Sequence, residues 1–486
     1  MPLKRVLWVS LLFLLVVAAD QVPATVSKQS AELTRALAQA SAPEHVWVYF
    51  RDKGPGGADD GSSVTSLTQR ALARRARRGH GDVVKLADRP VPFSYVEAVT
   101  TRVTRVRHVS RWLNAVSVEA DAAQVQALES LPFVERLDRV GRYGRRVEEA
   151  LPTEAGVRSS STRRGTYRLD YGASLAQMEQ INVPAVHELG LHGEGTIVAV
   201  FDTGFDNLPH EVFAGTRIVA QWDFVNGDPN VADEADRGDG SHGTSTLSVL
   251  GGFKEGALIG PAYNATFLLA KTEDTTRETP VEEDHWVAAA EWAEALGADV
   301  ISTSLGYLTY DAPFASYTFL DMNGTTAAST RAADLAVERG VVVLASAGNA
   351  GLNLLHNTLG APGDGRHVLA IGAVDLTSLR ASFSSVGPSA DGRIKPDLAA
   401  AGSRVKAAVS TTPTAYGLVS GTSFSCPLAA GVAALVVQAH PNYTPAQVAA
   451  VLRNTSSQAS APDNLLGWGI VNALAAIEAP EPPAGP

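Results

Sequence analysis

Apolar and polar positions follow two different patterns along this chain, and the change between them falls near residue 166. Downstream of it, short apolar runs rich in β-branched residues predict strands, at residues 196–202, 266–271, 299–303, 341–346 and 368–372. Longer segments between them predict helices, at residues 176–189, 241–251, 285–296, 325–339 and 422–440. Because strands that are apolar throughout must be covered on both faces, this alternation predicts an α/β fold with three αβα layers around a mainly parallel sheet.

Upstream of residue 141 the pattern is that of a smaller module. Its runs rich in β-formers predict strands, at residues 45–51, near 102–106, 112–119 and 133–137. A basic helix is predicted at residues 65–78, where a glycine ends it, and a second helix at 121–130, where an aspartate opens it. The order β-α-β-β-α-β predicts a small ferredoxin-like α+β module.

Three further segments lack a globular pattern. Residues 1–19 place two basic residues before an apolar run of 14 residues, which is short for a membrane span of about 20. We predict a cleaved secretory signal there, with an uncleaved membrane anchor as the alternative. Residues 141–165 are polar and carry paired arginines, which predicts a linker where maturation takes place. Residues 479–486 are rich in proline and predict a disordered tail.

The net charge of −11 hides two parts of opposite sign. Residues 20–165 hold 23 Lys and Arg against 17 Asp and Glu, whereas residues 166–486 hold 15 against 34. A net charge of +6 beside one of −19 predicts that the two parts meet face to face. The alternatives for the arginine-rich run are a solvated helix or a nucleic-acid patch, and the acidic remainder argues against nucleic acid.

Three short motifs supply a carboxylate, an imidazole and a hydroxyl, in that order. They are Phe-Asp202-Thr-Gly, Ser-His242-Gly-Thr and Gly-Thr-Ser423-Phe-Ser-Cys-Pro. A serine hydroxyl is a weak nucleophile until a base takes its proton and a third group holds that base in the right tautomer. We therefore predict that Asp202, His242 and Ser423 are catalytic. Taken singly, Ser423 is also typical of a helix N-cap, His242 of a structural histidine, and the Asp202 motif of half an aspartic-protease site.

The residues around these motifs, together with Ala-Ser-Ala-Gly-Asn349, resemble the subtilisin-like serine protease family over about residues 170–478. The resemblance implies that His242 accepts the Ser423 proton and that Asp202 orients the imidazole. It also implies that the Asn349 amide and the Ser423 backbone N–H form the oxyanion hole. The upstream module resembles, in its rhythm and position, the inhibitory propeptide of that family.

The same resemblance implies where a substrate lies. Ser304, Leu305 and Gly306 are similar to the family segment that pairs with the substrate backbone as an added strand. Glu273 and the acidic residues after it, as far as Asp284, border the S2 and S4 subsites in the family. We therefore hypothesise a preference for basic residues upstream of the cut, with a solvated acidic loop as the alternative.

No cofactor is required for the chemistry that the resemblance implies, and structural calcium is an open question. Residues 251–256 follow the predicted His242 helix, where well-known family members carry an Asn-rich calcium loop, and they offer few oxygen ligands. The acidic segment 228–239 is the alternative site, but spacing alone selects no ligand set, so the metal ligands are unknown. The one cysteine, Cys426, excludes an internal disulfide. It lies where the family has a small residue, which predicts core packing.

These observations predict a secreted serine endopeptidase, extracellular or in the cell envelope (periplasm), made as an autoprocessed zymogen. Its expected parts are a signal peptide (1–19), an inhibitory propeptide (20–140), a linker (141–165), a catalytic domain (166–478) and a tail (479–486). The expected partners are protein or peptide substrates and its own propeptide, without nucleic acid or stable membrane insertion, and we expect a monomer. Two other functions stay open: a peptide ligase or macrocyclase on the same fold, and a catalytically silent binding protein.

Overall fold

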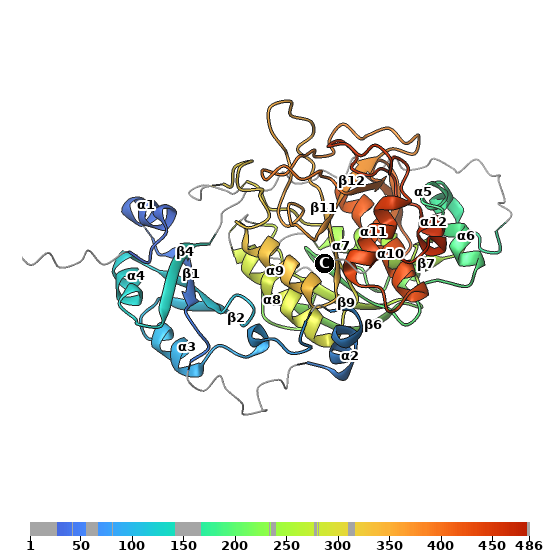
Figure 1. Ribbon diagram of the computed structural model, residues 1–486. Coiled ribbons are helices and arrows are strands. Elements are labelled where there is room, and N and C mark those ends of the chain that lie inside the picture. Colours follow the sequence, from blue (N-terminus) through green and yellow to red (C-terminus); the bar gives the residue numbers. More distant parts are fainter. Residues whose placement is uncertain are drawn as a thin grey trace, which may run out of the picture.

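A computed structural model describes residues 27–40, 42–54, 67–79, 81–140, 167–232, 234, 240–276, 279, 281–309 and 316–483. The N-terminal part of the chain forms a small body beside a larger one that is built from the rest (Figure 1). Each body has its own sheet. The predicted signal peptide (1–19) and the predicted linker (141–165) lie outside the described residues.

The small body is built on a four-stranded antiparallel sheet with the spatial order β2-β3-β1-β4. Its strands are β1 (Glu44–Phe50), β2 (Arg105–Ser110), β3 (Ala115–Ala120) and β4 (Val134–Arg139). Its helices are α1 (Ala31–Gln39), α2 (Gln69–Arg78), α3 (Phe93–Thr100) and α4 (Ala122–Glu129). Since α3 joins β1 to β2 and α4 joins β3 to β4, each of these strand pairs forms a split β-α-β unit, and the ferredoxin-like prediction is confirmed. The first helix of that order is α3, which the sequence pattern missed, whereas the predicted helix at residues 65–78 corresponds to α2, which packs on α8 (Val281–Leu296) of the large body.

The large body is built on seven parallel strands in the order β13-β12-β11-β10-β5-β9-β6. The strands are β5 (Ile197–Asp202), β6 (Arg217–Asp223), β9 (Thr266–Lys271), β10 (Val300–Thr303), β11 (Val342–Ser346), β12 (Leu369–Val374) and β13 (Leu398–Ala401). Two short antiparallel ribbons add β7 (Phe253–Lys254) with β8 (Leu258–Ile259), and β14 (Val405–Ala408) with β15 (Tyr416–Val419). Sequence patterns missed β6 and β13, which form the two edges of the sheet, because polar residues interrupt the apolar run of β6 and β13 is a short alanine run.

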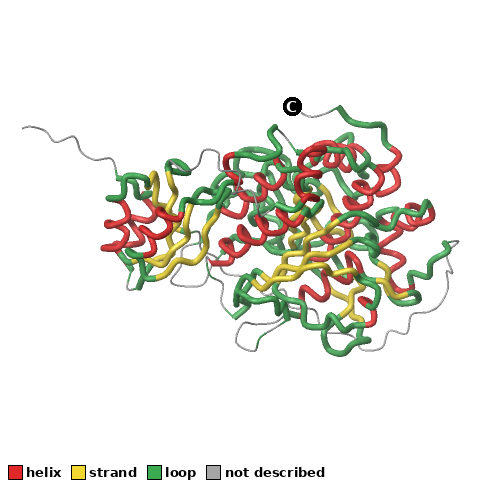
Figure 2. The backbone as a smooth tube through the Cα atoms, turned by 90° about the horizontal axis from the view of Figure 1, so that it is seen from below, coloured by secondary structure: helices red, strands yellow, loops and turns green. Residues whose placement is uncertain are grey.

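Helices cover both faces of the parallel sheet, which confirms the layered α/β prediction (Figure 2). On one face, α7 (Ser241–Gly251) and α10 (Thr422–Ala439) pack with Val198 and Val200 of β5. On the other face, α8 (Val281–Leu296) and α9 (Ala328–Glu338) pack with Ala199 and Phe201. Outside α10 lie α11 (Pro445–Asn454) and α12 (Ala473–Glu478). Among the described residues, α10 is the helix long and apolar enough to cross a bilayer, and 89% of its apolar window is buried in the large body.

The two faces of β1 pack against different bodies, because successive side chains of a strand point to opposite sides. Val46, Val48 and Phe50 lie in the core of the small body. Trp47 and Tyr49 belong to the cluster that contains α8 and α9 of the large body. The apolar core is therefore continuous across the contact between the bodies.

One predicted helix is interrupted in the structure. Residues 176–189 form two short helices, α5 (Leu175–Gln180) and α6 (Val183–Glu188). Asn182 between them has a left-handed conformation (φ 55°), and Pro184 follows in the first turn of α6. A left-handed residue followed by a proline interrupts the hydrogen-bond ladder, so the apolar periodicity continues although the helix does not.

Several boundaries also differ from the expectation, such as the start of β2 at Arg105 and the start of α8 at Val281. The strand predicted from residue 112 begins at Ala115, because residues 111–114 form a turn in which Asn114 has φ 50°. Residues 479–483 of the Pro-rich tail are among those described. There Gln447 of α11 donates from Nε2 to the carbonyl of Pro482 at 2.9 Å. This bond gives the tail a docking contact that its composition did not predict.

Candidate active site

The candidate catalytic residues come from three elements that meet at the carboxyl edge of the parallel sheet. Asp202 is the last residue of β5, His242 is the second residue of α7, and Ser423 is the second residue of α10. The rings of His242 and Phe424 lie 5.5 Å apart, which brings the start of α7 beside the start of α10. The carboxyl edge is where α/β sheets bind ligands.

Asp202 is fully buried and holds the imidazole of His242. Its Oδ1 accepts from Nδ1 of His242 at 2.6 Å and from the backbone N of Thr203 at 2.8 Å. Its Oδ2 accepts from Oγ1 of Thr246 at 2.8 Å. Because Nδ1 donates to the carboxylate, Nε2 is the ring nitrogen of His242 that can take a proton. Sequence reasoning missed Thr246, although its position four residues after His242 places both on one face of α7.

A close backbone approach keeps α7 against the end of β5. A Cβ at Gly243 would lie 2.1 Å from the carbonyl oxygen of Gly204 and 3.1 Å from Cβ of Asp202. Packed interiors do not accommodate such contacts without a shift of the backbone. The glycine after His242 therefore has a steric role in the position of the base.

Ser423 is 3% exposed and lies in the first turn of α10, where backbone N–H groups lack partners within the helix. Its hydroxyl donates to the carbonyl of Ser304 at 3.1 Å. The hydroxyl of Ser304 donates in return to the carbonyl of Ser423 at 2.8 Å. Gly421, with φ 152°, turns the chain into the helix. This pair of bonds holds Ser423 against the residue that follows β10.

Asn349 follows β11 and contacts the first residue of α10. Its Oδ1 accepts from the backbone N of Thr422 at 2.9 Å and from Oγ1 of Thr422 at 3.0 Å. Nδ2 is consequently the atom through which Asn349 can donate to a substrate oxygen. Thr422 is a positioning residue that sequence reasoning did not single out, although it lies within the Ser423 motif.

The predicted substrate segment follows β10 directly and adjoins Ser423 through Ser304. Leu305 is buried and accepts at its carbonyl from Oγ of Ser346 at 3.1 Å. Gly306 is exposed, and a Cβ there would meet nothing within 4 Å. An exposed backbone beside the candidate nucleophile is suited to pairing with an extended peptide.

The acidic residues assigned to subsites are buried in this chain. Glu273 is 5% exposed, and its Oε1 accepts from the hydroxyl of Tyr307 at 2.6 Å. Glu283 is 1% exposed, and Asp284 is fully buried at 3.4 Å from Arg107 of the small body. The alternative of a solvated acidic loop is therefore wrong for these residues. They are interior or interface groups while the small body is in place.

Cys426 packs against β10, as predicted. Its Sγ lies 3.6 Å from the carbonyl of Thr303, and burial raises the pKa of the thiol to about 12. Within the described part of the chain, no group of three or more His, Cys, Asp or Glu is placed to hold a metal ion. The predicted calcium segment, residues 228–239, falls only partly within that part.

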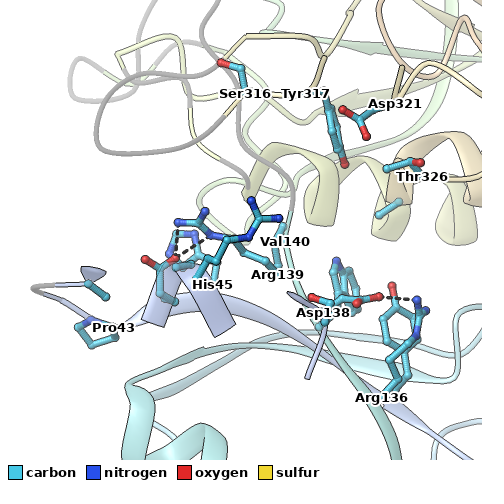
Figure 3. A pocket seen from close by; sticks show the side chains of 18 of the residues that line it. Pro43, His45, Arg136, Asp138, Arg139, Val140, Ser316, Tyr317, Asp321 and Thr326 are labelled. Carbon is cyan, nitrogen blue, oxygen red and sulfur yellow. Dashed lines mark hydrogen bonds and ion pairs between the residues drawn. The ribbon is translucent and has the colours of Figure 1, made fainter. Parts of the chain in front are cut away.

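A cavity of about 1040 Å³ lies between the two bodies, and none of the candidate catalytic residues lines it. Figure 3 shows Arg136, Asp138 and Arg139 facing it from the small body and Tyr317 and Asp321 from the large one. Arg136 pairs with Asp138 at 2.5 Å. This cavity is a gap between the bodies rather than a substrate cleft.

Comparison with known proteins gives this site its class. The family model described as the subtilase family matches residues 193–469. The model described as the Peptidase S8 propeptide domain, Bacteroidota, matches residues 45–154. The chain therefore belongs to the subtilase family, and its small body is a propeptide domain of that family.

The curated relatives include several subtilisins. Subtilisin NAT of Bacillus subtilis subsp. natto is 32% identical over 304 residues, which cover 62% of this chain and 70% of that protein. Subtilisin Savinase of Lederbergia lenta is 32% identical over 300 residues, which cover 62% of this chain and 97% of that protein. The chain is thus a subtilisin-like serine endopeptidase.

Solved structures share the fold. Fervidolysin from Fervidobacterium pennivorans, a keratinolytic enzyme related to subtilisin, matches with a TM-score of 0.63 at 22% identity. The match covers 91% of this chain and 62% of the fervidolysin chain. A protease of Pseudoalteromonas arctica PAMC 21717 matches with a TM-score of 0.50 at 24% identity, over 64% of this chain and 98% of that chain. At these identities the likeness extends to the fold alone.

Proposed function

We propose that the chain is a secreted endopeptidase made as a zymogen, with Asp202, His242 and Ser423 as its catalytic triad and Asn349 in its oxyanion hole. The observation that carries this proposal is the hydrogen bond of 2.6 Å between Nδ1 of His242 and Oδ1 of the buried Asp202. A carboxylate in that position selects the tautomer in which Nε2 acts as the base. The start of α10 lies beside that imidazole.

In the proposed reaction, Oγ of Ser423 attacks the scissile carbonyl carbon while Nε2 of His242 takes the hydroxyl proton. The oxyanion that forms accepts hydrogen bonds from Nδ2 of Asn349 and from the backbone N–H of Ser423. Collapse of this intermediate expels the amine, which receives the proton from His242, and leaves an acyl-enzyme. A water molecule that gives its proton to His242 then hydrolyses the ester. Asp202 stays ionised and stabilises the imidazolium.

We further propose that the propeptide domain assists folding and blocks the enzyme, and that the chain is cut within the linker at residues 141–165. Opposite charges across its contact with α8 support this role. Arg107 lies 3.4 Å from Asp284, and Arg111 lies 3.3 Å from Glu291. Such complementarity fixes the register in which two surfaces meet.

We propose that the mature enzyme is a monomer that acts outside the cell or in the cell envelope. The basic residues and apolar run of residues 1–19, placed ahead of the propeptide domain, support this location. The single cysteine leaves stability to packing, with structural calcium as an addition that the chemistry does not need.

The test is to express residues 20–486 as the wild type and as Ser423→Ala, and to follow both by gel and intact mass. The wild type is expected to be cut in the predicted linker, to give an N-terminal piece of about 15 kDa on the gel, and then to hydrolyse casein. The Ser423→Ala variant is expected to stay at full length. If the wild type also stays at full length and does not react with a serine-directed phosphonate, either the silent binding protein is favoured or a separate activating protease is required.

The peptide ligase is distinguished by its product. With a peptide substrate and an excess of a free amine acceptor, hydrolysis yields the acid, whereas a ligase or macrocyclase yields the transpeptidated amide. Mass spectrometry of the products separates the two. Mainly amide product would replace hydrolysis as the activity and keep the same catalytic residues.

A further inference from the structure

Helix α2 (Gln69–Arg78) of the propeptide domain lies apart from the sheet of that domain. It lies below α8 and β9 of the catalytic domain in Figure 1, and it packs on α8. Arg70, Arg74 and Arg78 are spaced by four residues and therefore share one face of α2. Arg74 is fully buried, and Arg75 and Arg78 are 3% and 1% exposed. Burial of three arginines by one short helix needs a surface built to receive cations.

The carboxyl end of α8 is one part of that surface. Arg74 donates from Nη1 to the carbonyls of Glu294 at 3.2 Å and of Ala298 at 2.7 Å. Thr68, the N-cap of α2, donates from its backbone N and its hydroxyl to the carbonyl of Ala295, at 2.9 and 3.0 Å. The last carbonyls of a helix lack partners within it and lie at the negative end of its dipole. They are natural acceptors for guanidinium groups.

Two buried carboxylates complete the surface. Glu294 is fully buried, forms an ion pair with Arg74, and accepts from Arg75 at 2.7 and 2.6 Å. Asp299, directly before β10, accepts from Arg70 at 2.5 Å and from Arg78 at 3.1 Å. Forked contacts of this kind match the planar guanidinium, whereas the compact charge of lysine does not reproduce them.

The contact also includes an ion pair in which the propeptide domain supplies the carboxylate and the catalytic domain the arginine, and its backbones approach closely. Asp88 of the propeptide domain accepts from Nε of Arg339, at the end of α9, at 3.0 Å. Arg78 donates to the carbonyl of Tyr443 at 2.9 Å. A Cβ at Gly340 would lie 3.1 Å from the backbone of Arg78. Charge and shape therefore select this helix rather than any basic segment.

The surface lies at the edge of the sheet opposite to the candidate active site. Asp299 precedes β10, and Gly195, whose carbonyl accepts from Arg70 at 2.6 Å, precedes β5. Asp202 ends the same strand β5, six residues long, so the two sites are about 20 Å apart along the sheet. A helix at this edge does not occlude the substrate cleft.

We propose that Glu294, Asp299 and the carboxyl end of α8 form a binding site for an arginine-bearing helix, and that α2 uses it to keep the propeptide domain bound after the linker is cut. The inference rests on the proposed maturation. The sheet of the propeptide domain and α2 are two anchors on one chain, so each raises the effective concentration of the other. Loss of one anchor is expected to weaken binding by about 100-fold or more.

The test separates binding from catalysis. The full chain with Ser423→Ala receives a recognition sequence for an external site-specific protease after residue 150, in the predicted linker. After cutting, size-exclusion chromatography shows whether the propeptide fragment stays bound to the catalytic domain. Titration with a fluorescently labelled propeptide fragment gives the Kd of that complex. The parent is expected to keep its fragment through the column. Free dissociation of the parent fragment would overturn the proposal.

The variants Arg74→Met and Arg78→Met remove the charge and retain an unbranched apolar side chain. Each leaves a buried carboxylate without its full set of partners, so Kd is expected to rise by about 100-fold or more. Arg77→Met is the matched control, because Arg77 is exposed on the same helix, and its Kd is expected to equal that of the parent. Equal Kd values for all three variants would overturn the proposal.

A variant on the catalytic side guards against misfolding of the propeptide domain. Glu294→Gln keeps the shape of the side chain and removes its charge, and it is expected to raise Kd in the same way, with circular dichroism and thermal unfolding as checks of folding. Unchanged retention in this variant would overturn the proposal. Because every chain carries Ser423→Ala, failure here leaves the peptidase proposal intact, and failure of self-processing in the wild type leaves this measurement unaffected.

Discussion

The contact between α7 and the end of β5 makes Gly243→Ala the most informative substitution in the candidate site. The added Cβ would lie 2.1 Å from the carbonyl oxygen of Gly204, and contacts shorter than 3.0 Å are essentially never seen for a real Cβ. The atom in contact belongs to the backbone, so no rotamer change relieves it. The start of α7, with His242, must move away from Asp202 by about 1 Å.

The expected cost follows from that displacement. A shift of about 1 Å in a catalytic group lowers the rate by about 100-fold, which corresponds to about 2.7 kcal/mol in activation free energy. Overpacking also destabilises a fold by about 1–3 kcal/mol, so the free energy of unfolding must be measured beside the rate. A stability loss alone changes the amount of folded enzyme, whereas displacement of His242 changes the activity of each folded molecule.

The assay is the rate of self-processing of the full chain, with phosphonate labelling of Ser423 as the measure of nucleophile activation. Gly215→Ala is the matched control, because a Cβ at Gly215 would meet nothing within 4 Å. The control is expected to process at the wild-type rate. If folded Gly243→Ala also processes and labels at the wild-type rate, the close approach does not position His242 and the reasoning is refuted.

Three further outcomes are expected. Asn349→Ala should lower kcat of the mature enzyme by about 10²–10³ with little change in KM, and an unchanged kcat would remove Asn349 from the oxyanion hole. Acid should release the propeptide. Burial and the nearby charge of Arg107 lower the pKa of His108 to about 4, and burial lowers the pKa of His285 well below 6.5. Both histidines are neutral in the contact and gain protons on separation, so affinity should fall as the pH drops from about 6.5 toward 4. Asp284, whose pKa burial raises to about 7, and Glu291, whose pKa burial also raises, act in the opposite sense, because their contribution is lost as the pH rises; gel filtration at several pH values is the measurement, and a contact that is unchanged or tighter at low pH would contradict the prediction. Thiol reagents should leave the native enzyme active, since Cys426 is buried and its thiol stays protonated, and rapid inactivation with labelled Cys426 would contradict that burial.

Local pattern was enough to predict most of the elements that carry the site. The strand ending at Asp202 and the helix starting with Ser241 were predicted at the residues where they occur, because apolar periodicity and glycine signals act over a few residues. The break at Asn182 was missed for the same reason, since apolar spacing continues through a residue whose backbone turns left-handed. Edge strands such as β6, with half-exposed polar positions, carry too weak a pattern to be found.

The sequence by itself determined the chemical groups, their order and the class of fold, because each depends on residue types at short, regular spacing. Only the tertiary structure decided which distant groups meet. The hydrogen bonds from Thr246 to Asp202 and from Thr422 to Asn349 depend on how α7 and α10 pack at the sheet edge. The burial of Glu273 and the docking of the Arg74 helix on Glu294 join segments far apart in the chain. Such contacts come from close packing and from the need to pair every buried charge, and neither leaves a periodic trace in the sequence.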